Sequence, residues 1–141
     1  MSDYRRWYVP GGTYFLTVVT YKRYPFFRDA SAVNLLREAW TKVQREKSFT
    51  NVASVLLHDH FHCLWTLPAG DDDYATRIKI IKDYFTSQWL SKGGLELPVT
   101  PSRAKRGNRG IWQRRFWEPV IRNEDALKNH FAYIRIDPVN P

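Results

Sequence analysis

Hydrophobic and polar positions follow two periods along the chain, and each period predicts a different kind of element. Runs rich in Val, Thr, Tyr and Phe predict strands at residues 13–20, 52–57 and 61–67, because these side chains suit a pleated backbone. The second and third runs are close enough to pair as a hairpin, and a short strand is expected near Val120 and Ile121. The strand pattern is therefore that of one antiparallel sheet.

Helical spacing of apolar residues predicts helices at residues 31–47, 74–90 and 124–136. Pro138 ends the last helix, since proline lacks the amide hydrogen that a helix needs. Three consecutive acids, residues 71–73, precede the second helix and are interpreted as caps that complement its dipole; a metal site is the alternative. The first helix is expected to bury one stripe, formed by Val33, Leu36, Trp40 and Val43.

The order of these elements indicates the fold. Strand, helix, strand, strand, helix and strand, followed by an extra helix, predict an α+β domain of ferredoxin-like order, with helices packed against an antiparallel sheet. Residues 91–110 are rich in Gly, Pro, Ser and Arg and are expected to form a long exposed loop. A chain of 141 residues holds one core and is too short for two, so residues 1–141 are expected to form a single domain.

Charge narrows the class of partner. The chain has 22 Lys and Arg against 14 Asp and Glu, a net charge of +8, and such a surface attracts nucleic acid. Many aromatic residues neighbour Arg or Lys, a mixture suited to stacking on bases beside phosphate contacts, above all in single strands. A merely solvated basic surface is the alternative. The expected nucleic-acid-binding residues are Arg5, Arg6, Arg103, Lys105, Arg106, Arg109, Arg114 and Arg115.

The compartment is expected to be the cytoplasm. The single cysteine, Cys63, excludes an internal disulfide and fits a reducing environment. No apolar run approaches the length of a membrane span, and the N-terminus lacks the apolar core of a signal peptide. We therefore expect no membrane partner.

A histidine pair is the first candidate site. Side chains at positions i and i+2 of a strand project from the same face, about 7 Å apart, so the imidazoles of His60 and His62 can converge on one ion. Phe61 and Cys63 would then point to the opposite face, toward a core. A hydrogen-bonded histidine pair without metal is the alternative for a lone His-x-His motif.

The last predicted helix carries the second candidate site. His130, Tyr133 and Asp137 share one face of it by i, i+3, i+7 spacing, so an imidazole, a phenol and a carboxylate would lie side by side. The alternative is that Tyr133 is half-buried packing and Asp137 a residue of the C-terminal turn. The adjacent apolar stripe is formed by Leu127, Phe131 and Ile134.

These residues resemble a known family. His60-Phe61-His62 is similar to the His-hydrophobe-His motif of the HUH single-tyrosine transposases, which include the REP-associated tyrosine transposases of bacteria. The resemblance runs from about residue 3 to 139. Besides residues 59–68, it is carried by residues 4–6, 11–13, 112–118, 121–122 and 133–134.

The resemblance implies roles for particular residues. His60 and His62 would be metal ligands and Tyr133 the nucleophile, with Asp137 as a further ligand at a position where the closest relatives are expected to have Asn. A site of nitrogen and oxygen ligands suits Mg²⁺ or Mn²⁺, and Mn²⁺ is better matched to imidazole. The rival nucleophile is Tyr84, whose neighbours on the second helix indicate packing.

His58 stands where the family is expected to have Pro, and is interpreted as an extra ligand or as a residue at the entry of the strand.

The activity implied is cleavage and strand transfer of single-stranded DNA that carries a hairpin, through a 5′-phosphotyrosine intermediate, by a monomer or a homodimer. The family usually continues past the segment 137–141, so a C-terminal part is expected to be missing. One alternative is therefore a truncated, catalytically reduced protein that binds hairpin DNA without cleaving it. A third hypothesis is a small metal-dependent hydrolase, for which the sequence offers no obvious general base beyond these histidines.

Overall fold

The computed structural model describes residues 9–114 and the backbone of residues 120 and 121. The strands are β1 (Thr13–Val19), β2 (Thr50–Leu56), β3 (His60–Thr66) and β4 (Val120–Ile121), and the helices are α1 (Ala30–Glu46), α2 (Tyr74–Ser91) and α3 (Pro101–Lys105). Short 3₁₀ turns at Tyr21–Arg23 and Phe26–Arg28 connect β1 to α1. The helix predicted at 124–136, with its apolar stripe, His130, Tyr133 and Asp137, lies outside the described residues, as do Arg5, Arg6 and Arg115.

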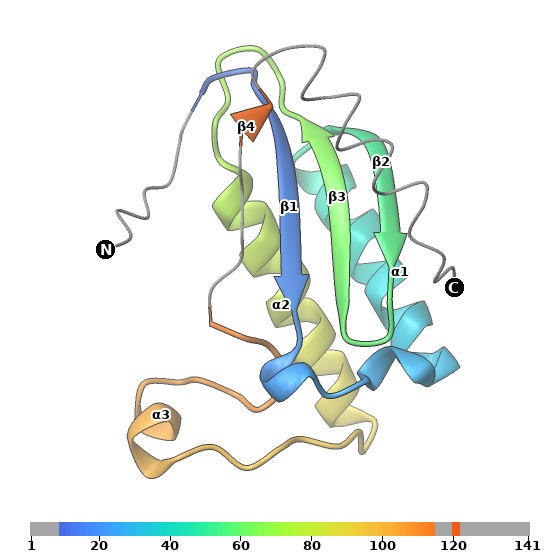
Figure 1. Ribbon diagram of the computed structural model, residues 1–141, viewed down its shortest axis with the longest axis vertical. Coiled ribbons are helices and arrows are strands. Elements are labelled where there is room, and N and C mark those ends of the chain that lie inside the picture. Colours follow the sequence, from blue (N-terminus) through green and yellow to red (C-terminus); the bar gives the residue numbers. More distant parts are fainter. Residues whose placement is uncertain (1–8, 115–119, 122–141) are drawn as a thin grey trace.

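The four strands form one antiparallel sheet in the order β2-β3-β1-β4. Helices α1 and α2 lie side by side behind it, so one layer of helices covers one face of the sheet (Figure 1). The predicted α+β class and ferredoxin-like order are confirmed. No helix within the described ranges is long and apolar enough to cross a membrane.

The two faces of the sheet differ in what they carry. Because side chains alternate along a strand, Phe61, Cys63 and Trp65 of β3 all point toward the helices, where they belong to the main core. On the other face, Phe15 and Leu64 form a smaller apolar cluster. The histidines of β3 alternate with the core residues and therefore lie on this second face, as predicted.

Helix α1 packs through a face slightly rotated from the predicted stripe. Val33 and Trp40 are only partly buried, whereas Ala32 and Ala39 are fully enclosed. Alanine has the smallest side chain that a helix favours, so it lets the helix approach its neighbours closely. The prediction favoured the larger hydrophobic residues Val33 and Trp40, whereas the buried face of α1 includes the small residues Ala32 and Ala39.

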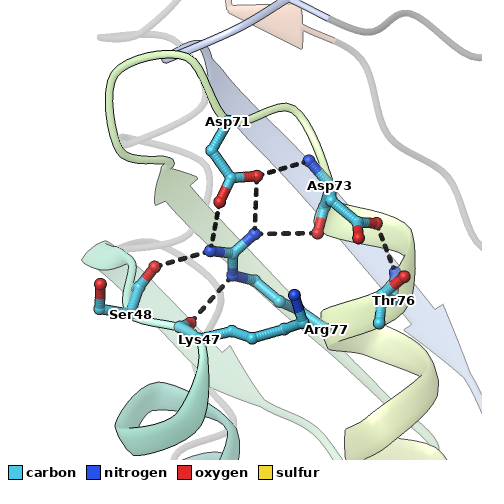
Figure 2. A network of polar contacts seen from close by, with 6 residues as sticks. All are labelled: Lys47, Ser48, Asp71, Asp73, Thr76 and Arg77. Atoms are coloured by element: carbon cyan, nitrogen blue, oxygen red, sulfur yellow. Dashed lines mark hydrogen bonds and ion pairs between the residues drawn. The ribbon is translucent and has the colours of Figure 1, made fainter.

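A buried arginine of α2 forms hydrogen bonds with the chain at the end of α1, as Figure 2 shows. The guanidinium of Arg77, 1% exposed, donates to both carboxylate oxygens of Asp71 at 2.8 and 3.1 Å. It also donates to the backbone carbonyls of Lys47 (3.0 Å) and Ser48 (2.8 Å), just past α1. Asp73 accepts from the amide of Thr76 at 3.0 Å and is the N-cap of α2. The cap interpretation of the acids is confirmed for this residue.

The predicted loop 91–110 was wrong in one respect, because it contains α3. Thr100 accepts from the amide of Arg103 at 3.2 Å, and Pro101 occupies the first turn, where its missing amide hydrogen costs nothing. The loop is also tied down: the amide of Leu97 donates to the carbonyl of Gly110 at 3.1 Å. Short helices of five residues give too little periodicity to be predicted.

Candidate active site and nucleic-acid interface

His60 and His62 lie together on the face of the sheet that α1 and α2 leave uncovered. Their ring centroids are 4.8 Å apart and their planes are nearly perpendicular, at 82°. His60 opens β3 opposite Val19, and His62 lies opposite Thr17. His62 is 5% exposed, and the side chain of His60 is 12% exposed. The two imidazoles therefore form a pair held by regular strand geometry.

His60 is oriented by the acid that precedes it. Its Nδ1 lies 2.6 Å from Oδ1 of Asp59, whose other oxygen accepts from Nε of Arg23 at 3.1 Å. Partial burial raises the pKa of Asp59, but the hydrogen bond from His60 and the charge of Arg23 outweigh this, and the pKa lies below its ordinary value. An ionised Asp59 accepts the Nδ1 proton and thereby places the lone pair of His60 on Nε2.

His62 is oriented from the neighbouring strand. Its Nδ1 lies 2.9 Å from the hydroxyl of Thr17, and its ring stacks on Phe15 at 5.3 Å. When Nδ1 donates to this hydroxyl, Nε2 carries the lone pair. Thr17 was not predicted, and the cross-strand register that brings it to His62 has no local sequence signal.

This donor set fits a divalent metal. Both imidazoles have Nδ1 engaged by an oxygen, the usual arrangement behind a ligating histidine. No cluster of three or more His, Cys, Asp or Glu side chains able to hold a metal occurs in the part of the chain that the structure describes. Oxygen ligands would have to complete the set, and the predicted one, Asp137, lies outside that part.

His58 does not belong to the pair. It is exposed in the turn before β3, and its carbonyl accepts from the amide of Phe27 at 3.0 Å. Of its two interpretations, strand entry agrees with this position.

Tyr84 lies on the helical side of the sheet, away from the histidines. Its hydroxyl donates to Oε1 of Glu38 on α1 at 3.2 Å. Desolvation and this hydrogen bond raise the pKa of Tyr84, which makes the phenolate harder to form. The structure therefore does not bring the rival nucleophile to His60 and His62.

The basic residues of the segment 103–114 have different surroundings. Arg109 is paired to Glu96 through two contacts of 2.7 Å, and this pairing lowers the pKa of Glu96 to about 2. Arg103 lies over the ring of Tyr21, at 5.7 Å from its centroid. Arg103, Arg109 and Arg114 line a groove of about 780 Å³ against α2, and Lys105 and Arg106 are exposed and do not line it.

The groove also has basic residues that sequence reasoning missed. Lys79 and Lys82 of α2 line its other wall. Along α2 they occupy polar positions between packed ones, and this spacing alone indicates only a solvent-exposed face of the helix.

Comparisons with known proteins identify relatives of the whole chain. No protein family model matches it. A protein of Escherichia coli K12 named REP-associated tyrosine transposase is 40% identical over 139 residues, which are 99% of this chain and 73% of that protein. A Haemophilus influenzae protein that bears the same name provisionally is 41% identical over 139 residues, 99% of this chain and 77% of that protein.

Solved structures agree with these relatives. A structure described as a REP-associated tyrosine transposase bound to a REP hairpin has a TM-score of 0.76 at 39% identity, covering 98% of this chain and 73% of that chain. A Deinococcus radiodurans R1 protein with a TM-score of 0.57 and 16% identity covers 99% of this chain and shares the fold alone. The resemblance carried by His60-Phe61-His62 is thus confirmed, and the chain belongs to the family of REP-associated tyrosine transposases.

Proposed function

We propose that this protein cleaves single-stranded DNA beside a hairpin and transfers the cut strand, with Tyr133 as the nucleophile. The observation that carries the proposal is the pair of oriented imidazoles at the start of β3. Membership of a tyrosine transposase family supports it, as does the hairpin bound to the related structure. The proposed substrate is bacterial DNA, so we propose the cytoplasm as the compartment.

His60 and His62 would hold a divalent metal, Mg²⁺ or Mn²⁺, with Asp137 as a further ligand. A metal bound there would polarise the scissile phosphate and stabilise the leaving 3′-oxygen. Asp59 and Thr17 would hold the two rings in the orientation that ligation needs. Mn²⁺ is the better match to two imidazoles.

Tyr133 would supply the covalent step. A phenol has a pKa of about 10, so it attacks only as it loses its proton. Its oxygen bonds to phosphorus, the bond from phosphorus to the 3′-oxygen breaks, and the products are a 5′-phosphotyrosine and a 3′-hydroxyl. Because the phosphodiester energy is kept in the covalent bond, another 3′-hydroxyl can reverse the step without ATP.

A labelled hairpin oligonucleotide with a single-stranded flank tests the proposal. With Mn²⁺, the wild-type protein is expected to form a denaturation-resistant adduct, which Tyr133→Phe loses while it still binds DNA. Tyr84→Phe is the matched control, since it removes a phenolic hydroxyl that bonds to Glu38 on the side of the sheet away from His60 and His62. Binding without an adduct in the wild type would favour the alternative, a hairpin-binding protein that no longer cleaves.

A further inference from the structure

We propose that the groove between α2 and the segment 103–114 holds the phosphodiester backbone of the DNA, and that Lys82 of α2 contacts a phosphate there. This inference rests on the proposed function and deepens it, since it says where the DNA is held. It differs from the expectation of a basic loop, because it adds a wall from α2 and leaves out Lys105 and Arg106.

The groove has the size and lining of a polyanion site. It measures about 780 Å³, and five basic side chains line it against a single acid, Asp83, among the described residues. These cations come from two elements, so the groove exists only in the folded chain. The basic side chains are Lys79, Lys82, Arg103, Arg109 and Arg114.

Ion pairing distinguishes four of these five cations from one another. Lys79 is paired to Asp83 at 2.6 Å, and Arg109 is paired to Glu96, so both charges are largely compensated within the protein. Arg103 and Arg114 pair with no carboxylate among residues 9–114. Charges that the protein leaves uncompensated attract phosphate most strongly and release most counterions on binding.

Lys82 is placed at the point where the two walls meet. Its ammonium donates to the backbone carbonyl of Gln113 at 2.8 Å, which bridges α2 to the segment 103–114. The contact therefore holds the charge of Lys82 in the lining of the groove, at the junction of its two walls.

Neutral polar side chains complete the lining. Thr86 and Ser87 lie on the α2 wall, one turn beyond Lys82, and Asn108 and Gln113 lie on the other. Hydroxyls and amides donate to phosphate and sugar oxygens, and such contacts set the position of a nucleic acid without reading its bases. We therefore expect the groove to bind with little sequence preference.

The groove lies on the helical side of the molecule, with the sheet between it and the histidine pair. Helix α2 packs on the face to which Phe61 and Cys63 point, and His60 and His62 face the other way. Loss of groove contacts should therefore weaken DNA binding while the metal site stays intact. Mn²⁺ affinity measured by calorimetry gives a readout independent of DNA.

The test compares two triple variants that lose the same charge. The groove variant carries Lys82→Gln, Arg103→Gln and Arg114→Gln. The control carries Lys92→Gln, Lys105→Gln and Arg106→Gln, which are all exposed and do not line the groove. Affinity for the labelled hairpin is measured at several salt concentrations. The groove variant is expected to lower the salt slope by about 2 to 3 units, since each lost phosphate contact lowers it by about 0.7 to 0.9. The control is expected to lower it by less than about 1 unit. Equal slopes for the two variants would overturn the proposal.

Further measurements locate the contact on the protein and on the DNA. Acetylation footprinting of the wild type is expected to show that DNA protects Lys82 and does not protect Lys92. Protection of Lys92 alone contradicts the proposal. Binding of a blunt hairpin and of an unpaired oligonucleotide shows whether the phosphates in the groove belong to the stem or to the flank. The groove variant should bind more weakly to the form whose phosphates lie in the groove. Unchanged affinity for both forms contradicts the proposal. If the wild type forms the tyrosine adduct and the groove variant binds DNA like the control variant, the groove proposal is refuted and the proposed function stands. If the wild type binds no DNA at all, the proposed function is refuted as well.

Discussion

Asp71→Asn is expected to destabilise the fold in a pH-dependent way, because it removes the charge that faces Arg77. The asparagine keeps the shape of the side chain and one acceptor oxygen, so packing is preserved. In the wild type, hydrogen bonds from Arg77 and from the amide of Asp73 hold the pKa of Asp71 at about 2, against an ordinary 3.8. The lowered pKa means that ionised Asp71 stabilises the folded state.

The size of the effect follows from the shift. A fall of the pKa from 3.8 to about 2 corresponds to roughly 2 kcal/mol at neutral pH, at ~1.36 kcal/mol for each pKa unit. Solvent reaches part of this carboxylate, whose side chain is 31% exposed, so we expect about 1 to 2 kcal/mol. A group with a depressed pKa contributes fully above its unfolded pKa and loses that contribution as pH falls toward the folded one. The difference between wild type and variant should therefore shrink between about pH 4 and pH 2.

Urea unfolding at pH 7, 4 and 2.5 measures this difference directly. Asp72→Asn is the matched control, since this neighbouring acid makes none of the contacts in Figure 2 and its change should cost little at any pH. Equal losses for the two variants, or a loss for Asp71→Asn that does not shrink at low pH, would refute the reasoning.

Two further substitutions test the electrostatics of the DNA surface and the metal site. Glu96→Gln removes the charge that compensates Arg109. The salt slope of hairpin binding, measured by anisotropy titration, should therefore steepen by up to about one unit. An unchanged slope would show that Arg109 does not contact the DNA. Thr17→Val removes the hydroxyl behind His62 and should weaken Mn²⁺ binding by about 10-fold in calorimetry, whereas Thr13→Val, at the other end of β1, should not; equal affinities would count against the metal site.

The fold was predictable because its signals are local. The run that became β3 alternates histidine with core residues, so one strand fixes both the buried face, through Phe61 and Cys63, and the face of the histidines. The start of α2 could be predicted for the same reason, since acidic residues just before a helix interact with its N-terminal end.

The missed features depend on contacts between distant residues. Thr17 reaches His62 across 45 positions through the β1–β3 register, and Arg109 finds Glu96 across 13 positions through the path around α3. The sequence alone therefore gives no sign that Glu96 compensates the charge of Arg109, one of the expected nucleic-acid-binding residues. Lys82 joined the basic surface only because α2 packs beside that segment.

The most direct measurement is peptide mapping of the covalent adduct. The wild-type protein is incubated with Mn²⁺ and a hairpin oligonucleotide, the adduct is digested with protease and nuclease, and mass spectrometry locates the nucleotide. The proposal predicts a 5′-phosphotyrosine on Tyr133, and none when both His60 and His62 are replaced by alanine. A nucleotide on Tyr84, or an adduct that persists without the two histidines, would contradict it.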